Sequence, residues 1–149
     1  MKRIKYLALA ALALTLSLSS CKKKIEADDS SQYFGTVWQG EIEYDINEYY
    51  YGKNVFRYEF LEGKKVIAEA AAYKITKAMS SELVEQTKAS GSFSAKGNKI
   101  KVVLEKPIVG YESADQFPVI FEGTVSGNYM TLKLEGSAVS LNKVTPPEV

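Results

Sequence analysis

The stretch that decides the fold is Thr36-Val-Trp-Gln-Gly-Glu-Ile-Glu-Tyr-Asp-Ile46, in which apolar and polar residues alternate. One face of an extended chain carries its large apolar members, Trp38, Ile42 and Tyr44. The other face carries the polar members Gln39, Glu41, Glu43 and Asp45. A period of two is the period of a β-strand, so the pattern predicts a strand with one buried face and a solvated acidic face.

The same alternation recurs along the chain, cut at short intervals by Gly, Asn and Pro, which favour turns. Two segments, which begin at Gly97-Asn98 and Gly127-Asn128, share one template: Gly-Asn, alternating apolar positions, then Leu-Glu. Gly and Asn supply the positive φ angles that tight hairpins require. The further strands predicted in this way are residues 55–61, 65–76, 97–105, 119–126, 127–135 and 138–144.

Two features of this pattern stay open. Residues 77–90, which lead into the hairpin segment 90–95, are compatible with a helical turn and with an irregular fourth strand. In residues 65–76, either of two sets can point inward: Ala68, Ala70 and Ala72, or Ile67, Tyr73 and Ile75.

With the undecided segment as a strand the count is eight, and an open edge of such strands would invite aggregation. We therefore predict an all-β fold, a single antiparallel up-and-down barrel of about eight strands. Its interior would hold Trp38, Phe56, Tyr58 and Phe60. Two longer connections, 47–54 and 106–118, lie at one mouth of this barrel or at opposite ends.

The first twenty residues predict a secretory signal: Lys2, Arg3 and Lys5 precede a short apolar run. We divide the chain into this signal (1–20), a lipidated cysteine with a flexible tether (21–32) and the barrel (33–149). The end of the signal, Leu18-Ser-Ser-Cys21, resembles the bacterial lipobox, which implies cleavage before Cys21 and its acylation. The alternatives are an ordinary secretory signal and an uncleaved anchor. Because Lys rather than Asp stands at position 22, the resemblance implies an outer-membrane lipoprotein, on either the periplasmic or the surface face.

The composition excludes several functions. The chain has no histidine and one cysteine, so Ser-His-Asp and Cys-His catalysis and Cys/His zinc sites are excluded. The net charge of +1 falls close to neutral without the signal cations, which argues against a nucleic-acid partner. Glu41, Glu43 and Asp45 lack the loop pattern of a calcium site. We expect no enzyme, no cofactor and no metal, and a monomer.

The region from about 33 to 145 resembles the lipocalin-like domains of small Gram-negative lipoproteins. The resemblance rests on Gly35-Thr-Val-Trp38 at the first strand, on the repeated Gly-Asn hairpins and on a closing alternating strand. It implies that Trp38 closes the base of the barrel beside an Arg or Lys from another strand.

The remaining candidates concern binding. Tyr49, Tyr50, Tyr51 and Tyr111 lie in the longer connections, where amphipathic rings suit a ligand or a protein partner. Alanines at 68, 70 and 72, if they point inward, either leave space for a small hydrophobic ligand or fill the taper of the barrel. The predicted function is a membrane-anchored binding module for such a ligand or for an envelope partner. The alternative is a structural or inhibitory envelope protein with a filled core.

Overall fold

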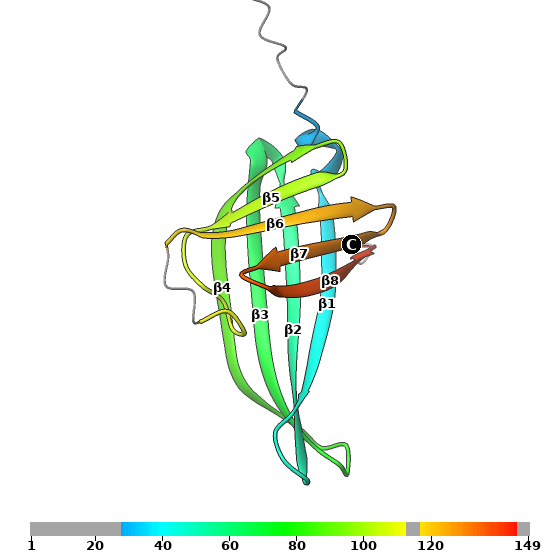
Figure 1. Cartoon of the computed structure of the whole chain (residues 1–149), viewed down its shortest axis with the longest axis vertical. Helices are drawn as coiled ribbons and strands as arrows, with labels where there is room; N and C mark the ends of the chain where they lie inside the picture. Colours follow the sequence, from blue (N-terminus) through cyan, green and yellow to red (C-terminus); the bar gives the residue numbers. More distant parts are fainter. Residues whose placement is uncertain (1–27, 113–116, 146–149) are drawn as a thin grey trace, which may run out of the picture.

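The computed structural model describes residues 28–112 and 117–145 of the chain (Figure 1). Its eight strands form a closed antiparallel barrel in the order β1-β2-β3-β4-β5-β6-β7-β8, which confirms the all-β, up-and-down prediction. The elements are η1 (Ser30–Tyr33), β1 (Thr36–Asp45), β2 (Tyr50–Leu61), η2 (Glu62–Lys64), β3 (Lys65–Thr76), β4 (Ser81–Lys96), β5 (Lys99–Leu104), β6 (Val119–Ser126), β7 (Tyr129–Leu134) and β8 (Ser137–Val144).

The segment that the sequence left undecided is mostly strand. β4 begins at Ser81 and pairs with β3 along nearly the whole length of β3, with one register shift opposite Ala72 and Tyr73. A turn at 77–80 joins the two strands, closed by the Thr76 side chain, which accepts a hydrogen bond from the Ser80 N–H. The helical alternative is wrong here, because pairing with β3 satisfies the backbone of a segment whose local pattern is ambiguous.

The first predicted connection is shorter than 47–54. β2 already begins at Tyr50, because its backbone pairs with β1 on one side and with β3 on the other. The Asn47 side-chain oxygen accepts hydrogen bonds from the N–H groups of Tyr49 and Tyr50, at 2.9 and 3.1 Å, and fixes the tight turn. The hairpin therefore has a four-residue loop rather than an eight-residue one.

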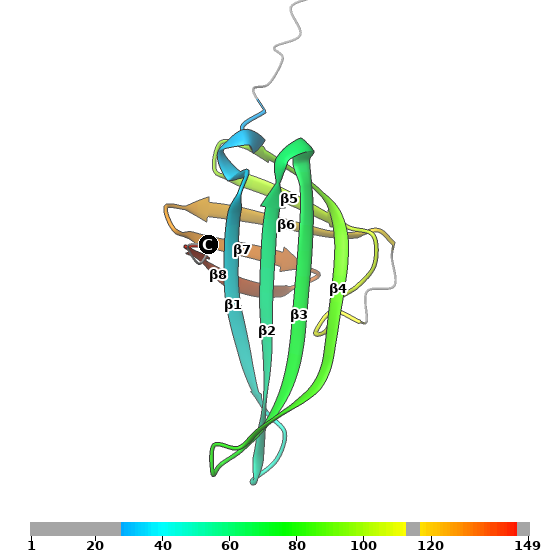
Figure 2. The ribbon, with the colours of Figure 1, turned by 180° about the vertical axis from the view of Figure 1, so that it is seen from behind.

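The barrel has a long half and a short half. β1 pairs with β2 as far as Asp45, but with β8 only over Val37–Gln39. β4 likewise pairs with β5 only from Gly91 onward. The far ends of β1–β4 therefore extend beyond the barrel as a four-stranded sheet, while β5–β8 cross the front of the barrel (Figures 1 and 2). We call residues 41–55 and 71–86 the projecting sheet.

A glycine marks each seam where the long half leaves the barrel. A Cβ at Gly40 would collide with the carbonyl oxygen of Ser140 on β8, and a Cβ at Gly91 would collide with that of Val103 on β5. Neither glycine has a positive φ, so the requirement is close approach of a neighbouring strand rather than backbone conformation. These glycines let the barrel close where the pairing ends.

Large side chains fill the barrel, and both ends are covered. Trp38, Phe56, Tyr58 and Phe60 are at most 2% exposed, and Ala68 and Ala70 of β3 are also fully buried. Past the register shift at Ala72 and Tyr73 the other set contributes Ile75, which is 8% exposed. At one end Tyr33 of η1 packs on Phe60, with ring centroids 6.1 Å apart. At the other end the chain after β5 folds inward and buries Ile108, Val109 and Tyr111.

Candidate interaction site

The interior of the barrel is one candidate for a ligand-binding site. Tyr58 is fully buried and Tyr111 is 5% exposed, and both rings contact Phe121. Burial raises the pKa of both phenols, so they stay neutral, and no described group lies within hydrogen-bond distance of either hydroxyl. The interior around them is packed with aromatic and aliphatic side chains. Two concavities, of about 620 and 600 Å³, instead lie on the outer surface.

Trp38 lies at the end of this interior that η1 covers. Its indole N–H donates to the Thr36 hydroxyl at 3.0 Å, and that hydroxyl donates to the Tyr33 carbonyl at 2.6 Å. Lys143 of β8 stands opposite Trp38 in the strand register. The indole nitrogen is thus satisfied by local groups, and Trp38 ties η1 to the first strand.

Tyr111 lies apart from the other tyrosines that the sequence singled out. It packs on Phe56, with centroids 5.6 Å apart, and helps to close the barrel. The Val109 N–H donates to the Thr87 hydroxyl at 2.8 Å and holds this segment against β4. Because Tyr111 is only 5% exposed, its ring is not available to a partner at the surface. The two longer connections lie in different places, one closing the barrel and one at the tip of the projecting sheet.

The tip of the projecting sheet carries the other three tyrosines. Tyr49 is 65% exposed, whereas Tyr50 and Tyr51 are half-buried. The ammonium group of Lys74 lies 4.1 Å from the centre of the Tyr50 ring, a cation–π contact that fixes Tyr50. Only Tyr49 of the three therefore presents most of its surface to solvent.

Exposed large apolar residues gather on this tip. Six of the nine in the described part of the chain lie in the β1–β2 and β3–β4 hairpins, and the other three are spread over 117–129. The six are Tyr44, Ile46, Tyr49, Met79, Leu83 and Val84. Single exposed apolar residues are ordinary, but several at one end of a molecule make that end a candidate interaction surface. We call these six residues the apolar tip.

The apolar tip is bordered by carboxylates. The hairpin of β1 and β2 forms the concavity of about 600 Å³, lined partly by Glu43, Asp45, Glu48 and Lys77. Lys53 pairs with Glu41 at 3.1 Å and with Glu43 at 3.3 Å, and these two contacts raise the pKa of its ammonium group. Among the described residues no cluster of three or more potential metal ligands occurs. The carboxylates thus form an acidic rim beside the apolar tip.

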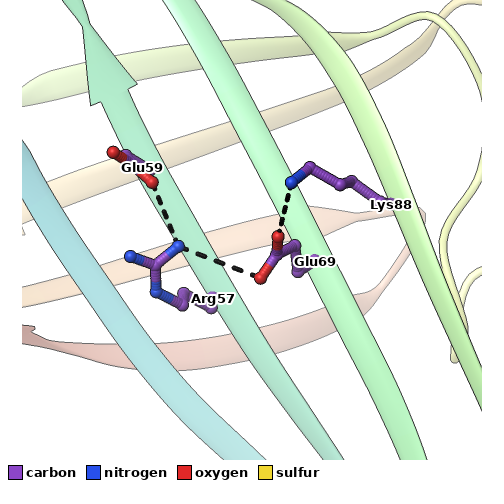
Figure 3. Close-up of polar contacts among 4 residues, drawn as sticks. All are labelled: Arg57, Glu59, Glu69 and Lys88. Carbon is purple, nitrogen blue, oxygen red and sulfur yellow. Dashed lines mark hydrogen bonds and ion pairs between the residues drawn. The ribbon is translucent and has the colours of Figure 1, made fainter.

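The outer face of the barrel half formed by β2, β3 and β4 is electrically compensated. Arg57 lies 3.1 Å from Glu59 and 3.9 Å from Glu69, and Lys88 lies 2.8 Å from Glu69 (Figure 3). The four residues alternate in sign across three neighbouring strands. This surface therefore offers little net charge to a ligand.

Five members of the apolar tip were missed by the sequence analysis. Tyr44 was predicted on the buried face of the first strand, but it is 45% exposed because this part of β1 projects beyond the barrel, and Ile46 was not singled out. Met79, Leu83 and Val84 all fall in the undecided segment, where a helix and a strand place the same side chains differently. A possible signal was Leu83-Val84 between Glu82 and Glu85, since two adjacent apolar residues in a strand must point to opposite faces.

The chain matches no protein-family model and no curated protein. None of the helices in the described residues is long and apolar enough to cross a membrane. Cys21 and the predicted signal lie outside the described residues, so the lipid anchor stays a prediction.

Proposed function

We propose that the protein is an outer-membrane lipoprotein, anchored through Cys21, that binds an envelope protein through its apolar tip. The observation that carries this proposal is the gathering of six exposed large apolar side chains at one end of the molecule. The described chain begins, at residue 28, at the opposite end (Figures 1 and 2). A tether from Cys21 thus leaves the tip directed away from the membrane.

The long strands set the reach of this arrangement. β4 has 16 residues, which corresponds to roughly 50 Å of extended chain at about 3.3 Å per residue. The carboxylates of the rim would be repelled by an anionic lipid surface, so the chemistry of the tip favours a protein over a membrane. The partner that fits is a protein with an apolar patch bordered by basic residues.

The filled interior favours a partner on the outside over a small hydrophobic ligand inside. It is equally compatible with the second candidate, a structural or inhibitory envelope protein that holds no small molecule. Native mass spectrometry of the protein extracted from membranes separates these functions from ligand transport. A retained small-molecule mass would restore the ligand hypothesis, and its absence is the expected result.

Site-specific photo-crosslinking in cells tests the tip. A photoreactive residue at Val84, which is 64% exposed, should give a protein adduct, and one at Ile120 on β6, 41% exposed, should not. The adduct should disappear when Tyr49 and Leu83 are both changed to Ser, while the barrel still folds by circular dichroism. Equal adducts at both positions, or an adduct that survives the double change, would contradict the proposal.

The anchor has its own test, independent of the tip. Metabolic labelling with a fatty acid should label the native protein and not Cys21→Ser. Label that persists in the mutant would defeat the anchor and leave the tip hypothesis standing.

A further inference from the structure

The larger of the two surface concavities has four lysines in its lining. This groove of about 620 Å³ runs over the outer face of the end of β4 and of β5, β6 and β7. These strands cross the front of the upper half of the molecule, near the end where the described chain begins (Figure 1). The lysines of the groove are Lys96, Lys99, Lys101 and Lys133.

The strand register brings these cations together. Lys96 and Lys99 are direct partners across β4 and β5, and like charges that face each other in a sheet destabilise it. Lys101 and Lys133 stand on either side of Glu122. None of Lys99, Lys101 and Lys133 has a carboxylate of the described chain within 4 Å.

The carboxylates of the groove do not cancel this charge. Asp28 pairs with Lys64 of η2 and accepts hydrogen bonds from Ser30, which lowers its pKa to about 2. Its charge is thus already matched by a lysine outside the groove. Glu122 is then the remaining carboxylate of the groove beside Lys101 and Lys133, in contrast to the alternating network on β2–β4 (Figure 3).

Hydroxyl groups in the groove add further hydrogen-bond donors beside the lysines. Ser94, Thr124 and Thr131 also line the groove, and each offers an O–H donor. Ammonium groups with neighbouring hydroxyl donors suit the oxygens of a phosphate group, which is a strong acceptor. The groove is therefore built for an anion with several oxygens.

The position of the groove indicates where that phosphate comes from. Asp28 is part of its lining and stands seven residues after Cys21. Seven extended residues span at most about 25 Å, so an acylated Cys21 would hold the groove close to the membrane surface.

We propose that this groove binds the headgroup phosphates of anionic lipids and lays the tethered end of the barrel against the membrane. The proposal rests on the anchored orientation of the proposed function, and it adds a second contact with the same membrane. Binding at the groove would also fix the orientation of the anchored protein, because the groove and the lipid chain together restrict how the projecting sheet can tilt.

Vesicle binding by the chain from residue 22 onward, without acylation, tests the groove. This chain contains all the residues that the structure describes, 28–112 and 117–145. The vesicles contain phosphatidylglycerol or, as a neutral reference, phosphatidylcholine. Lys99→Gln with Lys101→Gln should weaken binding to the anionic vesicles by about fivefold for each lysine replaced.

Matched controls separate the groove from net charge. Lys77→Gln with Lys106→Gln removes the same charge from the tip and from the segment after β5, and should leave vesicle binding nearly unchanged. Glu122→Gln should strengthen binding severalfold, because it removes the opposing charge from the groove. Higher salt should reduce all of these differences.

Three results would overturn the inference: equal losses in the groove and control pairs, no preference for anionic vesicles, or a groove that binds free inorganic phosphate but no vesicle. Since the assay uses no acyl chain and no protein partner, its failure leaves the Cys21 anchor and the apolar tip untouched. Failure of the crosslinking experiment leaves the groove untouched in turn. Failure of the labelling experiment removes the anchored orientation, and the vesicle assay still shows whether the groove binds anionic lipid.

Discussion

The long and short halves of this barrel share one core but expose different surfaces. β1–β4 project beyond the barrel and end in an apolar tip, and the cations Lys53, Arg57 and Lys88 on their outer faces are paired. β5–β8 stop where the barrel closes, and none of their groove lysines Lys99, Lys101 and Lys133 has a carboxylate of the described chain within 4 Å. Strand length, rather than composition, therefore separates the two surfaces: the apolar tip lies where β1–β4 continue beyond the barrel, and the groove lies on the part that closes it.

The largest expected difference in the free energy of unfolding is between a substitution in the shared core and one in the apolar tip. Phe60→Ala should lower the free energy of unfolding by about 3–5 kcal/mol, because Phe60 is fully buried between Tyr33 and Phe93. Leu83→Ala on the tip should change it by less than about 0.5 kcal/mol. Urea denaturation measures both. A large loss at Leu83 would mean that the projecting sheet is part of the stabilising core.

The next largest effect on stability is expected at the glycines where the long and short halves meet. Gly91→Ala should destabilise the protein by about 1–3 kcal/mol, because its Cβ would meet the backbone of Val103 on β5. Ser92→Ala, at the exposed neighbouring position, is the matched control and should be nearly neutral. Thermal unfolding of the two variants makes the comparison. If both were neutral, the close approach of β4 and β5 would not be required for closure.

A buried tyrosine links the stability of the core to pH. Burial raises the pKa of Tyr58 above its ordinary value of about 10, so folding favours the neutral phenol. Stability should therefore be unaffected by this group below about pH 10 and fall at higher pH, where only the unfolded chain ionises. Tyr58→Phe should reduce that alkaline loss and, at pH 7, change stability by about 1 kcal/mol at most. An unchanged alkaline slope in the variant would assign the loss to other groups.

The smallest effect is expected from the surface charges. Arg57→Gln should cost about 0.5 kcal/mol, because it breaks a partly exposed network, and the cost should shrink in high salt. Lys101→Gln in the groove should cost less than this, since no carboxylate of the described chain lies within 4 Å of the Lys101 ammonium group. The two variants are compared by denaturation at low and high salt. Equal costs would remove the electrostatic difference between the halves.

Much of the barrel could be predicted from local patterns. The alternation in Thr36–Ile46 and the Gly-Asn turns placed strands β1, β5, β6 and β7 near their observed positions, because period and turn chemistry are local properties. Trp38, Phe56, Tyr58 and Phe60 lie in the interior for the same reason. The lipid anchor at Cys21 was inferred from the order of its neighbours alone and stays a prediction.

The candidate interaction site could be predicted less well from the sequence than the fold. Tyr49 is exposed at the tip, but Tyr111 from the other connection is buried, because the chain after β5 folds over the barrel end rather than away from it. Both residues lie in polar, turn-rich stretches, and nothing local distinguishes a segment that closes a barrel from one that points into solvent. The lysines of the groove come from β4, β5 and β7, and only strand pairing brings them together.

The sequence by itself determined that this chain forms an antiparallel barrel, because the side-chain period of two and the turn residues act within a few positions. Tertiary structure alone decided that four strands extend beyond the other four, that Ala68 and Ala70 of β3 face the core, and that the apolar and lysine-rich surfaces lie in different parts of the molecule. Those outcomes depend on register between distant strands, where a shift of one residue moves every side chain to the opposite face.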